Sequence, residues 1–353
     1  MSSEGQGRRV ARPVLTACHA NTHRRSLIVF AVSVCVLVAV SAAACLVGSS
    51  SVGPGDLWAL VTGSELSAPA RNILLNVRLP RVASALLAGG ALAVSGAVIQ
   101  AVLDNPMASP NIIGINSGAG LAVLVVGALA PALMFLAPLA AFLGAVVSAL
   151  LIFALSFGAQ ASRLTVVLAG IAISTIFGAG MNAVLIMAPD AYVNASGFLV
   201  GGLAGVTLRT LLAPACYILV ALPLALLFAG RLNLMALGDE RAHSLGMRVK
   251  AARIHFLVIS ALLAGAAVSF AGLLGFVGLI VPHLVRFFVG HDNRVVLPLS
   301  MLVGAAFVTA CDMVSRVLFA PYELPVGITM AFLGGPFFIY LIVKRRGYSD
   351  ARS

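Results

Sequence analysis

Charged residues are scarce in this chain of 353 residues: they make up 9% of it, while hydrophobic residues make up 61%. A soluble domain of this size has too little interior to bury so much apolar surface, so the composition excludes an ordinary soluble protein. About 20 consecutive apolar residues are enough to cross a bilayer. The sequence therefore predicts an all-α, polytopic membrane protein.

The apolar runs set the expected number of helices and the domain limits. We expect a transmembrane domain over residues 26–346, a disordered cytoplasmic tail over residues 1–25 and a second cytoplasmic tail over residues 347–353. A shorter element near 282–290 would bring the number of transmembrane helices to about ten. The longer spans are expected at roughly 26–47, 81–103, 111–130, 133–157, 164–187, 209–229, 251–275, 295–318 and 325–343.

Lysine is almost absent, and this excludes one source of energy. The chain has only Lys250 and Lys344, and valine precedes each of them. A P-loop needs the sequence Gly-Lys-Ser/Thr, because the lysine neutralises nucleotide phosphates. The chain therefore has no P-loop and cannot bind ATP in that way, so we expect another subunit to supply the energy. An ion-coupled carrier usually places acidic residues within its spans, whereas four acids that could serve here lie near predicted span ends: Asp104, Asp190, Asp312 and Glu323.

Cysteine is also rare and shows no pattern that would bind metal. The five cysteines include no CxxC pair and no zinc-type spacing. Four of them lie in apolar spans, where cysteine usually packs as a small apolar residue. His283 follows Pro282 and has no second ligand nearby in the sequence, so we expect it to bond to backbone rather than to a metal. We predict no metal site and no cofactor.

Basic residues, in contrast, are concentrated on one side of the membrane. With the N-terminus in the cytoplasm, seventeen of the 22 lysines and arginines fall on the inner side. This bias agrees with the positive-inside rule, so the net charge of +11 mostly reflects topology. The basic residues are scattered over loops without an aromatic run, which argues against nucleic-acid binding. The outer side has five: Arg71, Arg78, Arg81, Arg209 and Arg316.

A broken apolar segment and an internal repeat point to transport. Residues 272–286 contain three glycines, a proline, a histidine and an arginine within an apolar run. Such a segment is tolerated at membrane depth only where protein or a watery cavity satisfies it. Residues 85–91 align with residues 261–267, and the matching continues to Pro106 and Pro282. Because the two copies enter from opposite sides, we expect an inverted repeat, as in many transporters.

A short polar segment between two spans on the inner side is a candidate contact for a partner. Two acidic residues lie in its first turn, and Gly246 could end the short helix. Its apolar residues could face a partner, and the alternative is a solvated connector. The residues expected to form the contact are Leu237, Gly238, Asp239, Ala242, Leu245 and Gly246.

Six motifs in a fixed order resemble one family. They are Arg78-Leu79-Pro80-Arg81, Gln100 with residues 105–110, the loop at 237–246, residues 275–286, Asp312 with Arg316, and residues 323–328. Over residues 26–346 the chain resembles the permease family of ABC importers for ferric siderophores, haem and vitamin B12. The resemblance implies a ten-helix, non-catalytic subunit in the bacterial cytoplasmic membrane. It also implies three kinds of partner: two ATP-binding subunits, a second permease subunit and an extracytoplasmic substrate-binding protein.

The resemblance also implies roles for individual residues. The loop at 237–246 would dock on the ATPase. The arginines Arg78, Arg81 and Arg316 would receive acidic residues of the binding protein. Residues 164–187 would line the pathway, through Ser174, Thr175, Gly178 and Asn182, and the cytoplasmic gate would involve Met107 and Ser162.

Several alternatives stay open from the sequence. Asp312 and Arg316 are four residues apart and could pair with each other on one helix, while Arg78 and Arg81 could contact lipid headgroups. The leading function is a permease for a ferric siderophore, with haem or vitamin B12 as the alternative substrate. A secondary transporter or channel would agree with the inverted repeat, but no acidic residue in the middle of a predicted span supports it. A membrane anchor for a redox or signalling complex would explain neither the outer arginines nor the inner loop.

Overall fold

The computed structural model describes residues 11–48, 53–64, 66–111, 113–158, 163–320 and 322–350. All regular structure in these ranges is helical. Seven helical spans are long and apolar enough to cross a membrane, and three shorter apolar helices bring the number to ten among the described residues. The predicted all-α, polytopic fold with about ten spans is therefore confirmed.

The helices fall into two halves of the chain. The first half contains α1 (Ala11–Leu46), α2 (Pro54–Thr62), α3 (Ala68–Ile73), the π-helix η1 (Leu74–Arg78), α4 (Leu79–Leu103), α5 (Ile115–Leu129), the 3-10 helix η2 (Pro131–Leu136), α6 (Ala137–Gly158), α7 (Arg163–Met187) and α8 (Asp190–Val200). The second half contains α9 (Leu208–Leu227), α10 (Ala229–Met235), α11 (Asp239–Ser244), α12 (Val249–Ala271), α13 (Val277–Val289), α14 (Asn293–Val317) and α15 (Val326–Asp350).

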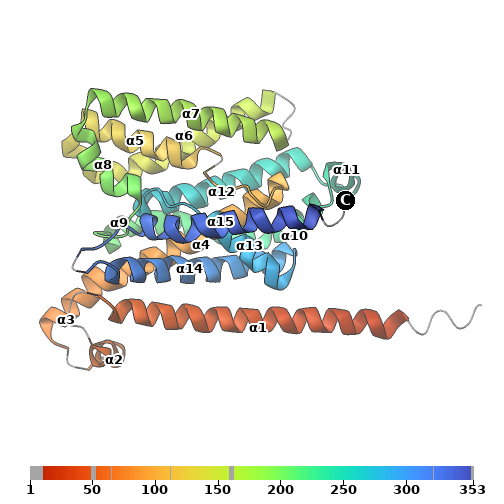
Figure 1. Cartoon of the computed structure of the whole chain (residues 1–353), viewed down its shortest axis with the longest axis horizontal. Coiled ribbons are helices and arrows are strands. Elements are labelled where there is room, and N and C mark those ends of the chain that lie inside the picture. Colours follow the sequence, from red (N-terminus) through yellow and green to blue (C-terminus); the bar gives the residue numbers. More distant parts are fainter. Residues whose placement is uncertain are drawn as a thin grey trace, which may run out of the picture.

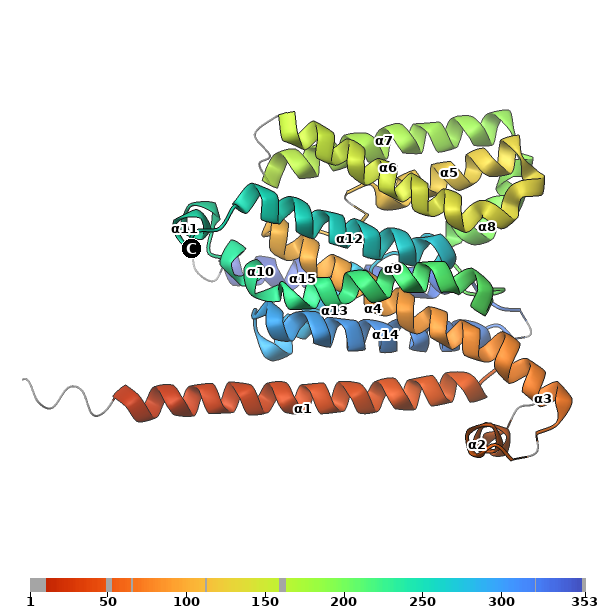
Figure 2. The same cartoon turned by 180° about the vertical axis from the view of Figure 1, so that it is seen from behind.

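The centre of the bundle is formed by α4, which packs against α12, α13 and α14. Helices α5, α6 and α7 lie on one side of this core, and α1 forms the opposite edge (Figures 1 and 2). Glycines let the central backbones approach closely: a Cβ atom on Gly96 would lie 1.9 Å from the carbonyl oxygen of Gly278. On Gly89 it would lie 2.2 Å from that of Gly304. In lipid, such small residues allow the tight packing that drives helix association.

The repeated segments lie in helices of opposite direction. Helix α4 begins at the end of the bundle where α3 lies, whereas α12 begins at the other end, beside α11 (Figure 1). The two helices pack against each other, and the hydroxyl oxygens of Ser95 and Ser260 lie 2.6 Å apart between them. This arrangement is what an inverted repeat predicts.

The broken segment at 272–286 begins a separate helix. Helix α12 ends at Ala271, four residues before the expected limit, and α13 contains the element expected near 282–290. Gly272 has φ +70° and Phe276 has φ +65°, and neither value is compatible with a continuous right-handed helix. Gly334 makes room for the Phe276 ring, since a Cβ atom there would lie 2.5 Å from it.

The expected disordered tail differs from the structure. Helix α1 begins at Ala11, ahead of the candidate membrane span, which begins at Arg24. Adding turns to an existing helix is favourable without a new nucleation step, and Pro13 lies in the first turn, where proline is tolerated. At the other end, α15 continues to Asp350. The limits of the transmembrane domain at 26–346 stay a prediction.

Candidate functional site

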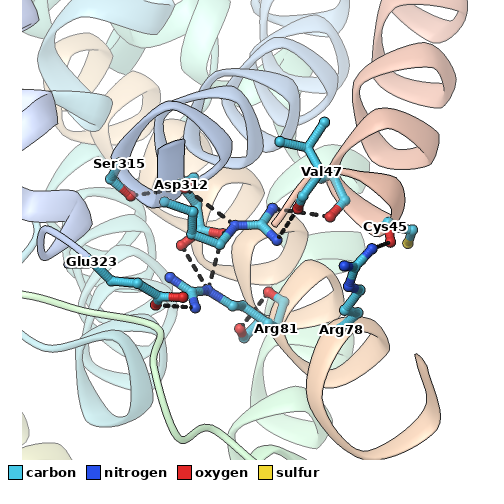
Figure 3. Close-up of polar contacts among 10 residues, drawn as sticks. Cys45, Val47, Arg78, Arg81, Asp312, Ser315 and Glu323 are labelled. Carbon is cyan, nitrogen blue, oxygen red and sulfur yellow. Dashed lines mark hydrogen bonds and ion pairs between the residues drawn. The ribbon is translucent and has the colours of Figure 1, made fainter. Parts of the chain in front are cut away.

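The outer end of the bundle holds a buried ionic cluster, which we call the outer arginine cluster: Arg78, Arg81, Asp312, Arg316 and Glu323 (Figure 3). Arg81 on α4 places Nε 3.0 Å from Asp312 Oδ1 and Nη1 2.7 Å from Glu323 Oε2. Arg316 on α14 places Nε 3.2 Å from the other oxygen of Asp312. One buried carboxylate thus pairs with two arginines and ties α4 to α14.

Two arginines of this cluster also hold the end of α1. Arg316 donates to the carbonyl oxygens of Ala44, at 3.0 Å, and Val47, at 2.8 Å. Arg78 donates to the carbonyl oxygens of Cys45 and, at 2.8 Å, Leu46. The last carbonyl groups of a helix lack partners within that helix. The arginines therefore cap the C-terminus of α1, whose orphan carbonyl groups favour positive charge.

The three arginines expected at the outer surface are buried in this cluster. Arg78, Arg81 and Arg316 are only 4%, 8% and 6% exposed, and each is bonded within the chain. The pairing of Asp312 with Arg316 was one of the open alternatives, and it is present. The capped α1 terminus and the pair between Arg81 and Glu323 could not be predicted from the sequence, because these partners lie far apart in the chain. Docking of a binding protein on these arginines stays a prediction.

On the inner side, α11 forms the loop expected to contact a partner. Leu245 is 61% exposed and Leu237 is about half exposed. Ala242 is fully buried, so its expected place on the exposed face is wrong: it anchors the loop on the bundle. The anchor is strengthened by Arg253 of α12, whose Nη2 lies 2.8 Å from Asp239 Oδ2. The loop is thus fixed to the bundle and exposes two large apolar side chains, Leu237 and Leu245.

Two glycines set the bends of this inner loop. Gly238 precedes α11 with φ +98°, and Gly246 follows it with φ +83°. Side chains other than glycine rarely adopt such values. The backbone N–H of Gly246 also donates to the His243 carbonyl at 2.9 Å. The backbone conformation at both positions therefore favours glycine.

Helix α7 carries the residues predicted to line the pathway. It lies at the edge of the bundle, opposite α1 (Figures 1 and 2). Thr175 and Asn182 are exposed on it, and a Cβ atom on Gly178 would meet nothing within 4 Å. Successive helical residues point about 100° apart, and Ser174 points inward, where its buried hydroxyl lies close to Gly114. Ser174 therefore does not belong with the other three residues.

This difference between neighbours gives a direct test of α7. In a protein whose native cysteines are replaced by alanine, we expect Thr175→Cys to react readily with a small charged thiol reagent. Ser174→Cys should react at least about tenfold more slowly, because reaction needs an exposed thiolate. Val220→Cys on the exposed surface of α9 serves as the lipid-facing control and should also be protected. Labelling rates measured by mass spectrometry check the prediction; equal protection of Thr175→Cys and Val220→Cys would contradict it.

The two predicted gate residues differ in what the structure says of them. Met107 is half-buried in the turn between α4 and α5, and its backbone N–H donates to Asn105 Oδ1 at 2.9 Å. Ser162 lies outside the described residues. The assignment of both residues to the gate stays a prediction.

A second polar contact joins the repeats at the inner end. Arg286 on α13 donates to Gln100 Oε1 and to the Ala97 carbonyl at 3.3 Å, both on α4. The amide of Gln100 in turn donates to the Gly278 carbonyl at 3.1 Å. Arg286 therefore stabilises the junction between α4 and α13, and its charge is compensated by amide and carbonyl dipoles.

Ten spans, antiparallel repeated helices with a break after the second, and an anchored inner loop define a polytopic membrane transport subunit. The FecCD transport family matches residues 34–344, and the chain belongs to this family. The haemin transport system permease HmuU of Yersinia pestis is 38% identical and aligns with 88% of this chain and 94% of its own length. The Fe(3+) dicitrate permease FecC of Escherichia coli K12 is also 38% identical, over 82% of this chain and 88% of its own.

The fold agrees with a solved relative. A metal-chelate type ABC transporter in an inward-facing conformation superposes with a TM-score of 0.80 at 28% identity, covering 90% of this chain and 99% of that one. The chain is thus the non-catalytic, multi-pass membrane permease of a bacterial ABC importer for iron chelates, haem or cobalamin. Membership of the family implies ATPase and binding-protein partners. The predictions of a secondary transporter, a channel or a membrane anchor are therefore not retained.

Proposed function

We propose that this permease passes a ferric siderophore from an extracytoplasmic binding protein to the cytoplasm. The observation that carries the proposal is the range of its relatives. Permeases named for Fe(3+) dicitrate, Fe(3+)-citrate, achromobactin and Fe(3+)-hydroxamate match between 78% and 91% of the chain at 32–38% identity. Relatives named for haemin and cobalamin also match, so haem or vitamin B12 is the alternative substrate.

The chemistry of α7 agrees with a bulky cargo. Residues 164–187 contain no charged side chain, and the exposed face carries Thr175, Gly178 and Asn182 among apolar residues. Small and weakly polar side chains offer few strong contacts, so a large chelate can move along them without being held tightly. Helix α7 is mostly exposed in the single chain, and we propose that a second permease subunit covers it, with the pathway between the two copies.

The substrate is tested by uptake in intact cells. Cells with and without this gene receive radiolabelled ferric citrate, a ferric hydroxamate, haemin and cobalamin in separate assays. We expect loss of the gene to abolish uptake of an iron chelate and to spare cobalamin uptake. Loss of haemin or cobalamin uptake alone would establish the alternative substrate and contradict the siderophore proposal.

The partners are proposed from the two ends of the bundle. Two ATP-binding subunits dock on the exposed Leu237 and Leu245 at the inner end. The binding protein docks at the outer end, where the charge of Arg78, Arg81 and Arg316 attracts an acidic rim. Arg71 and Arg209 are exposed at that end and can pair directly with carboxylates.

Exposed and buried outer arginines call for different tests of docking. The substitution Arg81→Glu would place a third carboxylate beside Asp312 and Glu323. A loss of uptake in this variant would therefore reflect damage to the fold and not a loss of docking. We expect Arg71→Glu with Arg209→Glu to slow binding-protein association on the order of tenfold at low salt, because exposed charges mainly govern encounter rates. Surface plasmon resonance at several salt concentrations measures this effect.

Two cytoplasmic substitutions serve as the matched control for docking. Arg231 and Arg248 are exposed on the inner side, and Arg231→Glu with Arg248→Glu should leave binding-protein association unchanged. If the outer pair of substitutions has no effect on the rate or on its salt dependence, the outer arginines contact lipid headgroups, and docking does not use them.

A further inference from the structure

The chain's one tryptophan lies on a short helix outside the main bundle. Helix α2, which carries Trp58, lies beyond α1 on the side away from the other spans (Figures 1 and 2). Helix α2 is level with the C-terminal end of α1, and its axis runs across that of α1. Helix α3 extends beyond α2 along the direction of α1 in both views. Because α1 is apolar and long enough to cross a membrane, its C-terminal end lies near a membrane surface, and α2 lies level with that end.

Helix α2 is fixed to the bundle on one side only. Leu57 packs against a small cluster that includes Ala44 and Cys45 at the end of α1 and Val82 on α4. Trp58, the next residue, is 70% exposed. Pro54, one helical turn before it, is also exposed, so this face of α2 has no partner among the described residues.

The surroundings of α2 indicate that lipid meets this face. Helix α1 is the nearest span, and its exposed side chains include Leu27, Phe30, Val36 and Val38. These apolar residues face hydrocarbon in a membrane. Helix α7, where the pathway and the second subunit are proposed, lies on the opposite side of the bundle (Figure 1). The proposed pathway and the proposed second subunit therefore lie on the side of the bundle away from Trp58.

The outer arginine cluster fixes the depth of α2. Arg78 and Arg316 bond to the carbonyl groups at the end of α1, and Leu57 of α2 packs against Ala44 and Cys45 at the same end. Tryptophan is enriched where bilayer and water meet, because its ring is apolar and its N–H remains near water. We propose that α2 is an interfacial helix whose Trp58 inserts into the headgroup region of the outer leaflet and anchors the outer end of α1.

Because Trp58 is the only tryptophan, its fluorescence reports on this site alone. The full chain is reconstituted into lipid nanodiscs made from phosphatidylcholine brominated either near the headgroup or deep in the acyl chain. We expect blue-shifted emission compared with free tryptophan and strong quenching by the shallow bromine. The deep bromine and aqueous acrylamide should each quench much less.

Two variants calibrate the measurement. Trp58→Phe should remove the tryptophan emission and give the background. Tyr322 is 80% exposed in the outer segment between α14 and α15; in the Trp58→Phe background, Tyr322→Trp should be quenched by acrylamide and spared by both brominated lipids.

Three outcomes would overturn the proposal. Quenching of Trp58 by acrylamide alone would place it in water, where a soluble partner meets it. Protection from acrylamide and from both lipids would mean that protein, such as a second copy of the chain, covers it. Stronger quenching by the deep bromine would place Trp58 in the hydrocarbon core.

Discussion

Replacing Leu245 by aspartate is expected to abolish ATPase association and transport while leaving the permease inserted in the membrane. Leu245 is exposed on a loop held in place by the Arg253–Asp239 pair and by buried Ala242, so the change leaves these anchors intact. A carboxylate buried without a partner in an apolar interface costs on the order of 3 kcal/mol or more. Association should therefore weaken by at least about 100-fold.

The effect is measured by co-purification of the ATPase with tagged permease and by ATP-driven uptake in proteoliposomes. Tyr322→Asp adds the same charge to an exposed residue at the other end of the bundle and is expected to leave ATPase association unchanged. Gly246→Pro offers a second variant, because proline cannot adopt φ +83° and would remove the bond from the Gly246 N–H. Normal co-purification of the ATPase with both loop variants would rule out the coupling role.

Replacing Asp312 by alanine is expected to have the largest effect on stability. Asp312 is 1% exposed and is the shared partner of Arg81 and Arg316. Its removal leaves buried Arg316 without a carboxylate partner and leaves Arg81 with Glu323 alone. Breaking a buried ion pair from one side costs about 3–5 kcal/mol. We expect a large fall in the thermal unfolding midpoint in detergent, followed by the loss of the monodisperse peak in size-exclusion chromatography.

A control and a rescue separate this effect from a general sensitivity of the site. Glu323 is partly exposed and pairs with Arg81 from the solvent side, so Glu323→Gln should lower the midpoint only slightly. Arg81→Met combined with Asp312→Leu removes both partners and replaces them with apolar groups, which should restore part of the lost stability. An Asp312→Ala midpoint equal to that of Glu323→Gln would show that the cluster does not stabilise the fold.

The outer end of the bundle carries both buried and exposed arginines. The outer arginine cluster connects α1, α4, α14 and the segment before α15, so it gives the outer end a fixed shape. Exposed Arg71 and Arg209 are the groups that a binding protein can reach without disturbing that shape. This division explains why charge reversal must be tested at exposed positions before any loss of uptake is assigned to docking.

The sequence by itself determined the class of fold and the inner loop. Apolar runs of membrane length predict helices because backbone groups in lipid must bond within their own segment. For that reason the spans at 81–103, 164–187 and 209–229 correspond closely to α4, α7 and α9. The positions of Gly238 and Gly246 were also readable, since a local change of backbone direction needs residues that tolerate positive φ.

Only the tertiary structure decided which side chains are exposed and which are buried or paired. Arg81 is distant in the chain from Asp312 and Glu323, and their pairing depends on how α4 packs against α14 and the segment before α15. Ser174 and Thr175 look alike in the sequence, yet the hydroxyl of Ser174 is buried and Thr175 is exposed. Apolar periodicity is weak in helices surrounded by lipid, because the lipid-facing side is as apolar as the packed side. The packing of neighbouring helices, and not the local sequence, therefore selects the face that each residue presents.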